Sequence, residues 1–506
     1  MSSKAAAMRK KIWIRKMTGI VLTLALTVPL AAACTKDSGA DDKTERTLRI
    51  ATYSGPDDEY FRQQFSDTFE ITHSNIKIEL VPIIDYSMYS MPRKEGEAQP
   101  DPLVKMQELM EGPNPPDIVM LQNLEQLPEL VSKNMLLQLD PLITKEKYNT
   151  SDFVPAVIDG LKDAGDGKLY ALSPLFTSSV LMYNKALFNE AGVSFPKDNM
   201  TWTEIFELAR RVTKGEGENR KYGFAFNPYP FNDSLFYELG NYYTNTLGVR
   251  MFNDAGDKMT VDSDQWEKVW KTMQGLVKDK IMPGGMDPNQ MMNMKMMPSS
   301  GGEFNPFQND LFKSGKLAMV LAQSYQINDM IAANKNAANY PGYTPIDWDI
   351  VTVPQHEEAK GVGGNFYMSG LMGINAKAQN QKDAWAFLKF VNGEDWAKLK
   401  SRSVSQMVSR KKYIQPRDGL SYNVQAFYSL KPGPANELNE LYRKNPNVGQ
   451  VQGIGQQYFK QAMDGTKGVR ESLKEWQTAG NSALQQLKDN PNMPFPMGAR
   501  PGVIMY

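Results

Sequence analysis

A short apolar run, Pro116-Asp117-Ile118-Val119-Met120-Leu121, is the stretch that decides the fold. Its last four side chains are apolar without the alternation of a half-exposed strand, and the polar pair Gln122 and Asn123 follows directly. Continuous apolar runs of this length are typical of strands buried on both faces of a parallel sheet. We therefore predict a buried strand here, inside an open α/β sheet.

Three elements upstream of this strand fit the same sheet. Residues 47–52 and residues 76–81 alternate apolar and polar side chains, and between them phenylalanines recur every fourth residue from Phe61. This order predicts strand, helix, strand and then the buried strand. Open α/β sheets bind ligands beyond the carboxyl ends of their strands, so we expect Tyr53 and the polar pair after residue 121 at a ligand surface.

Local signals continue downstream. Thr201 and Glu204 have the spacing of a capping box, with apolar residues on one helical face behind them. Residues 456–487 are compatible with helix, with interruptions around Gly465 and Gly468. Residues 253–257 contain oxygen ligands but lack the spacing of a calcium loop, so we predict a hairpin turn there.

The N-terminus has the layout of a signal peptide. Basic residues crowd the first sixteen positions, and an uncharged apolar run from 20 to 33 follows them. That run is shorter than the roughly 20 residues that a membrane span needs, and it ends at Leu30-Ala-Ala-Ala-Cys34. This boundary resembles a bacterial lipobox, although Ala31 stands where an aliphatic residue is usual. We predict a signal peptide over residues 1–33.

Cys34 is the only cysteine of the chain. It has no partner for a disulfide, and a buried structural thiol or a free reactive thiol are the alternatives to lipidation. Its place at the expected cleavage boundary favours a thioether-linked lipid anchor. Residues 35–46 are polar and without apolar periodicity, so we expect a flexible tether and a folded part that begins near Thr47.

Length and charge narrow the class of protein. The 506 residues, 41% of them hydrophobic, exceed what one core usually serves, so we expect two lobes. Fifty-seven basic residues balance fifty-seven acidic ones, which leaves no field that would attract nucleic acid. We expect no nucleic-acid partner.

Four segments carry a resemblance to a known family: residues 116–142, 167–185, 312–325 and 363–390. Their order and spacing resemble those of the extracellular solute-binding lipoproteins of ABC importers, of the family 1 sugar-binding type that includes maltose-binding protein. The resemblance implies an α/β, two-lobed, periplasmic-binding-protein-like (type II) fold with a ligand cleft between the lobes. It places residues 47–173 plus about 364–408 in lobe 1, and residues 174–363 plus about 409–506 in lobe 2.

The same resemblance implies a function. The protein would be a monomeric, non-enzymatic receptor, lipid-anchored on the extracytoplasmic face of the cell membrane, without a cofactor. It would capture a small-molecule solute, an oligosaccharide or related compound, and deliver it to ABC permease membrane subunits. Contacts to both lobes would shift an equilibrium between open and closed forms.

Candidate ligand residues come from strand ends and from the resemblance. Tyr325 matches a family position where an aromatic ring stacks on a sugar, and a core tyrosine is the alternative. Gln122 and Asn123 have amides that donate and accept hydrogen bonds, with turn formation as the alternative. The resemblance adds crossover residues, a further strand end and a loop rich in aromatic residues: Tyr53, Phe176, Thr177, Asn227, Tyr229, Asn365, Phe366 and Tyr367.

Other functions have weaker support. A surface-anchored glycoside hydrolase would use paired carboxylates, but no sequence pattern selects a pair, and neither His73 nor His356 lies in a hydrolase motif. A ligand sensor for a membrane kinase would use the same fold. The methionine-rich residues 291–297 fit flexible apolar packing better than a soft-metal site.

Overall fold

The computed structural model describes residues 44–53, 55, 58–84, 101–229, 234–284, 305–364, 366–402, 406–433, 437–444 and 448–489. The chain divides at Thr44, and the segment from Glu45 onward is one compact unit. The signal peptide, Cys34, most of the tether, Asn365 and residues 291–297 lie outside the described residues. Within the described residues, no helix combines the length and apolar character needed to cross a membrane.

The first sheet has the order β2-β1-β3-β10-β4. Its strands are β1 (Arg46–Thr52), β2 (Ile76–Pro82), β3 (Ile118–Met120), β4 (Ala171–Leu172) and β10 (Met372–Ile374). The three predicted strands are confirmed, and β1 lies parallel to both β2 and β3. The expectation of a parallel environment around β3 is wrong on one side, because β10 returns from far along the chain and pairs with it antiparallel.

The predicted helix with a phenylalanine every fourth residue is also confirmed, with one irregularity. It consists of α1 (Glu59–Phe61), a π-helical turn (Arg62–Ser66) and α2 (Asp67–Thr72), and Phe61, Phe65 and Phe69 are all buried. The other helices beside this sheet are α4 (Pro102–Glu111), α5 (Gln126–Ser132), α6 (Asp140–Lys145), α7 (Pro155–Ala164), α15 (Gln381–Val391) and α16 (Glu394–Lys400).

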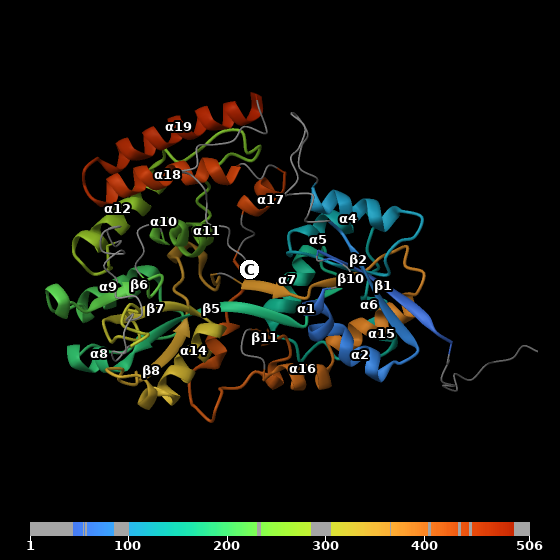
Figure 1. The fold of residues 1–506 in the computed structure, drawn as a ribbon. Helices are drawn as coiled ribbons and strands as arrows, with labels where there is room; N and C mark the ends of the chain where they lie inside the picture. Colours follow the sequence, from blue (N-terminus) through green and yellow to red (C-terminus); the bar gives the residue numbers. More distant parts are fainter. Residues whose placement is uncertain are drawn as a thin grey trace, which may run out of the picture. The chain divides into compact units, whose positions relative to one another are not determined.

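The second sheet is built around one long strand, β5 (Leu175–Asn184), which is labelled in the middle of Figure 1 and pairs with β9. Its order is β11-β5-β7-β6, with β8 and β9 also paired to β5. The other strands are β6 (Tyr222–Ala225), β7 (Leu317–Gln323), β8 (Trp348–Thr352), β9 (Phe366–Ser369) and β11 (Met407–Val408). Strands β6 and β7 are parallel, whereas β7, β8, β9 and β11 run antiparallel to β5.

Helices pack on both faces of the second sheet. They are α8 (Lys185–Ala191), α9 (Trp202–Val212), α10 (Ser234–Glu238), α11 (Asn245–Leu247), α12 (Asp264–Lys278), α14 (Ser324–Lys335), α17 (Glu437–Lys444), α18 (Val448–Met463) and α19 (Val469–Asp489). A second π-helical turn (Leu239–Thr244) joins α10 to α11. In β5, Val180 and Met182 belong to one buried cluster while Leu181 and Tyr183 belong to the other. Alternation along β5 therefore separates two hydrophobic cores.

The remaining local predictions are confirmed. The Thr201–Glu204 capping box is formed in both directions. The helix near the C-terminus is interrupted between α18 and α19, which lie side by side (Figure 1). Phe252 bridges antiparallel to Met259, and the Asn253 side chain accepts hydrogen bonds from the Asp257 and Lys258 amides, so this segment is the predicted hairpin turn.

The chain passes between the sheets along β5, β9 and β11. Arg410, which follows β11, anchors the last of these passages and is 3% exposed. Its guanidinium donates to the carbonyls of Asn392 (2.9 Å) and Asn149 (3.0 Å) and lies 4.4 Å from the centre of the Phe153 ring. A charge buried this deeply persists because all three guanidinium nitrogens donate a hydrogen bond, the third to the Tyr148 hydroxyl (2.9 Å), and the Asp152 carboxylate lies 3.8 Å away.

Candidate functional site

At the first sheet, the ends of the parallel strands β1 and β3 meet through one side chain. Gln126, the first residue of α5, accepts hydrogen bonds on Oε1 from the Tyr53 hydroxyl (3.1 Å) and from the Gln122 backbone amide (2.9 Å). Gln122 is exposed and Asn123 is partly buried. The structure thus brings the predicted residues Tyr53 and Gln122 together, as expected for neighbouring parallel strands.

At the second sheet, the ends of the parallel strands β6 and β7 form a matching group. Asn227 and Tyr229 follow β6, and the Asn227 side chain accepts a hydrogen bond from the Tyr229 amide (2.9 Å). Tyr325 is the second residue of α14, directly after β7, and it is 45% exposed, so it is not a core tyrosine. Asp329 acts electrostatically on both Tyr229 and Tyr325, so both hydroxyls lie within electrostatic range of its carboxylate.

The tyrosines of this group stay neutral near physiological pH. Burial, the Asp310 charge and a hydrogen bond to Asp310 raise the pKa of Tyr229 to about 12. Burial, with Tyr242 and Asp329 nearby, also raises the pKa of Tyr325. Because the Tyr229 hydroxyl donates its hydrogen to Asp310, its oxygen can offer only lone pairs to another molecule.

Glu238, the last residue of α10, is a partly buried acid in this group. Burial raises the pKa of Glu238 to about 7, against the opposing effect of its hydrogen bond with Asn227. Its carboxyl group is therefore partly protonated near neutral pH, and it can either donate or accept a hydrogen bond.

The crossover residues form a third group, along β5 and β9. Thr177 stands opposite Tyr367, and Tyr367 is 41% exposed. Phe176 is fully buried and stacks on Phe366 with ring centres 5.1 Å apart, so no face of the Phe176 ring is open to a ligand in this arrangement. The predicted contact at Asn365 lies outside the described residues.

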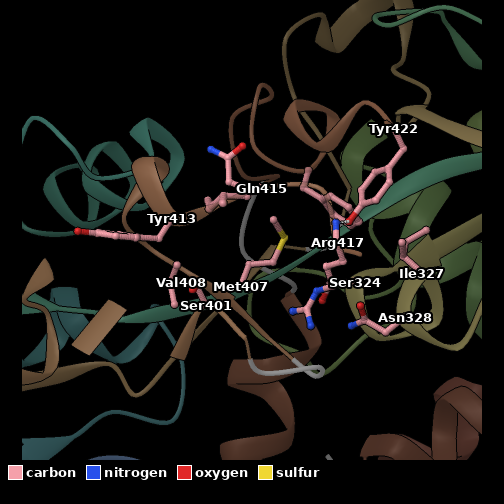
Figure 2. A pocket seen from close by; sticks show the side chains of 12 residues that line it. Ser324, Ile327, Asn328, Ser401, Met407, Val408, Tyr413, Gln415, Arg417 and Tyr422 are labelled. Atoms are coloured by element: carbon pink, nitrogen blue, oxygen red, sulfur yellow. Dashed lines mark hydrogen bonds between the residues drawn. The ribbon is translucent and has the colours of Figure 1, made fainter. Parts of the chain in front are cut away.

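Two depressions flank the crossing strands. The larger, drawn in Figure 2, holds about 410 Å³ of space that is continuous with solvent and lies between β11, the start of α14 and residues 413–427. Its described lining includes the partly buried Arg417, whose pKa is lowered by burial, and contains none of the predicted ligand residues. The smaller depression is lined by Ser178 and Ser179 of β5 and includes Phe366.

Sequence reasoning missed several members of these groups. Gln126 stands four residues after Gln122, a spacing that indicates contact only once a helix is known to begin there. Tyr242 and Glu238 lie in an aromatic-rich segment whose irregular π-helical turn hides any periodicity. Asp310 is far from Tyr229 in the sequence, and only the tertiary fold brings the two together. Asp329 stands four residues after Tyr325 on α14, a spacing that indicates contact once the helix is known.

Two α/β sheets joined by three passages, with polar and aromatic side chains at the carboxyl ends of parallel strands in each sheet, define a two-lobed solute-binding fold. The family model for "Bacterial extracellular solute-binding protein" matches residues 53–398. The chain belongs to this family.

Curated relatives are more distant and match only in part. The chain is 26% identical over 223 residues to the "Diacetylchitobiose binding protein NgcE" of Streptomyces coelicolor, a match that covers 42% of this chain and 41% of that protein. It is 24% identical over 303 residues to the "Mannitol-binding protein" of Pseudomonas aeruginosa, covering 59% and 61%. The match thus spans about two fifths of the first of these relatives.

Solved structures agree on the fold. A "sugar transporter" of Rhizobium etli in "an open conformation" has a TM-score of 0.56 at 19% identity, covering 86% of this chain and 99% of that one. The "sugar-binding protein MalE" of Xanthomonas citri has a TM-score of 0.55 at 14% identity, covering 88% and 98%. At these identities the likeness concerns the two-lobed α/β fold alone.

Proposed function

We propose that this protein captures a carbohydrate or a related polyhydroxylated solute outside the cell and delivers it to an ABC permease. Family membership carries the proposal, because the matched region from 53 to 398 includes the strand ends that bear Tyr53, Gln122, Tyr229 and Tyr325. Relatives named for diacetylchitobiose and for mannitol support a ligand rich in hydroxyl groups.

The chemistry of the strand ends suits such a ligand. Hydroxyl groups both donate and accept hydrogen bonds, and the amides of Gln122 and Asn227 and the phenol of Tyr229 are neutral partners for them. Tyr325 presents a half-exposed ring on which the apolar face of a sugar can stack. A solute that touches both strand-end groups favours the arrangement in which the lobes close on it.

The lobe boundaries are part of this proposal. Residues 47–173 with about 364–408 form lobe 1, and residues 174–363 with about 409–506 form lobe 2. The membership of β1 to β4 and β10 in the first sheet, and of β5 to β8 in the second, supports this division. The strands β9 and β11 pair with β5 of the second sheet, although their residues fall within the range proposed for lobe 1.

Titration calorimetry against a panel of mono-, di- and oligosaccharides and sugar alcohols tests the function. We expect at least one ligand to bind with micromolar affinity or better. Tyr325→Ala should weaken the affinity roughly 5- to 30-fold, because a stacked ring contributes roughly 1–2 kcal/mol. Tyr60→Ala is the matched control, since Tyr60 is an exposed tyrosine (56%) on α1, outside the three groups, and it should bind like the parent. If no compound of the panel binds, the proposed function is rejected. If Tyr325→Ala and Tyr60→Ala bind the ligand with equal affinity, Tyr325 is not part of the site.

We further propose that Cys34 carries the lipid anchor and that residues 35–46 tether the receptor near its permease. Each acyl CH₂ buried in the bilayer contributes about 0.8 kcal/mol, so two or more chains hold the protein stably. Cys34→Ser should bind ligand normally yet appear in the medium when cells are fractionated and immunoblotted. Cell-surface retention of this variant would rule out the anchor.

A further inference from the structure

Gln126 is a polar side chain in an unusual place. It is 2% exposed, although glutamine is mostly found at protein surfaces. Its Oε1 joins the ends of β1 and β3 by accepting from the Tyr53 hydroxyl (3.1 Å) and from the Gln122 amide (2.9 Å). These contacts bind together two of the residues proposed to meet the solute.

The orientation of the Gln126 amide follows from its partners. The Gln122 backbone N–H can only donate, so the Gln126 atom that faces it must be the oxygen. The Tyr53 hydroxyl, bonded to the same oxygen, must therefore donate as well. Its single hydrogen is used, and the Tyr53 oxygen offers only lone pairs to a third group.

Two polar atoms beside this junction have no hydrogen-bond partner among the described residues. One is the donor Gln126 Nε2 and the other is the acceptor Asn123 Oδ1, and both are shielded from solvent. Unpaired buried polar groups are costly, and those that persist in folded proteins often mark functional positions. Here both unpaired atoms, Gln126 Nε2 and Asn123 Oδ1, belong to residues next to or bonded to Gln122.

We propose that Gln126 is a positioning residue of the solute site, which acts by fixing the Tyr53 hydroxyl as an acceptor and by holding the Gln122 loop. The inference rests on the proposed function. A solute hydroxyl that donates to Tyr53 Oη meets a correctly oriented acceptor, at no cost in reorientation. The site therefore favours neutral, hydroxyl-bearing solutes at this position over groups that only accept hydrogen bonds, such as carboxylates.

A double-mutant cycle with Tyr53 tests this role, with calorimetry using the tightest sugar of the panel. Gln126→Met and Tyr53→Phe should each weaken binding about tenfold, the effect of one hydrogen bond. The double variant should also lose about tenfold rather than a hundredfold, because the Tyr53 hydroxyl is useful only when Gln126 orients it. Gln126→Glu keeps an acceptor oxygen and should retain more affinity than Gln126→Met.

Gln107→Met is the matched control. Gln107 is a partly buried glutamine on α4 that makes two side-chain hydrogen bonds, to Glu129 (2.9 Å) and from Lys133 (2.8 Å), away from Tyr53. It should bind like the parent protein. Two outcomes would overturn this inference and leave the proposed function standing. One is additive losses of affinity in the double-mutant cycle, and the other is full affinity in Gln126→Met while the parent protein binds sugar. A parent protein that binds nothing in the panel would overturn the proposed function, and this inference with it.

Discussion

Gly223→Ala is expected to lower the free energy of unfolding by about 3 kcal/mol. Gly223 lies in β6, where an added Cβ would be 2.1 Å from the carbonyl oxygen of Ala209 in α9 and 2.6 Å from its carbonyl carbon. These are backbone atoms, so no side-chain rotation relieves the clash, and the strand or the helix must shift. Urea unfolding followed by circular dichroism measures the loss.

Gly275→Ala is the control of opposite sign. Gly275 lies inside α12, and a Cβ there would meet nothing within 4 Å. Alanine should stabilise this helix by about 0.5–1 kcal/mol, because glycine loses more backbone entropy on folding. Since Asn227 and Tyr229 follow β6, Gly223→Ala should also weaken solute binding. Unchanged stability in Gly223→Ala would mean that β6 and α9 are not packed this closely.

The parts of the fold that were predictable from sequence are those encoded locally. The apolar run before Gln122, the phenylalanine spacing from Phe61 and the Thr201 capping box each involve residues a few positions apart, so their pattern is visible without the fold. The antiparallel partner of β3 was not predictable, because β10 comes from more than 250 residues further along the chain. Its three apolar residues carry no signal of direction.

The candidate site divides in the same way. Strand ends and a family resemblance made four site residues predictable from the sequence: Tyr53, Gln122, Asn227 and Tyr325. The side chains that orient these four residues were not predictable from the sequence. The contact of Gln126 with Tyr53, for example, spans 73 positions and forms only when the strands β1 and β3 align. Phe176 shows the converse limit: its aligned position indicated a ligand contact, while packing against Phe366 buries the ring.

A second long-range contact links the helices of the two sheets. Leu441 of α17 lies where a Cβ on Gly256 would contact it at 2.4 Å, so α17 is packed on the second hydrophobic core. From α17, Arg443 forms ion pairs with Asp101, the N-cap of α4, and with Glu129 of α5 (3.5 Å). The side chains of Arg443 and Asp101 are 16% and 22% exposed, so solvent and salt screen their attraction less than that of a fully exposed pair.

The pKa of Glu129 shows that its charged form is favoured at this contact. Burial alone would raise it, but hydrogen bonds from Lys133 and Gln107 and the charges of Lys133 and Arg443 bring it below the ordinary value. Glu129 is also one helical turn from Gln126 on α5, so the ion pair and the proposed solute site share a rigid element.

Arg443→Glu is expected to loosen the two lobes from each other. The substitution replaces the attractions of Arg443 to Asp101 and Glu129 by two repulsions. We expect the contact between the lobes to lose about 1–2 kcal/mol, because the pair is partly exposed. This loss shifts the equilibrium between lobes in contact and lobes apart roughly 5- to 30-fold. In a Cys34→Ser background, small-angle X-ray scattering should give a larger radius of gyration. Adding Glu129→Lys should recover part of the change, because it restores one attraction.

Arg470→Glu separates this effect from a general loss of stability. Arg470 lies on α19 and, among the residues that the structure describes, forms ion pairs with carboxylates at the start of α12 or just before it: Asp262 (2.6 Å), Asp264 (2.7 Å) and Glu267 (3.1 Å). Its reversal should lower the urea midpoint while the radius of gyration stays that of the parent. If Arg443→Glu also leaves the radius of gyration unchanged, or if Glu129→Lys fails to reverse its effect, the ion pair does not set the arrangement of the lobes. If both hold as expected, the arrangement of the two lobes depends on an ion pair that lies outside the proposed solute site.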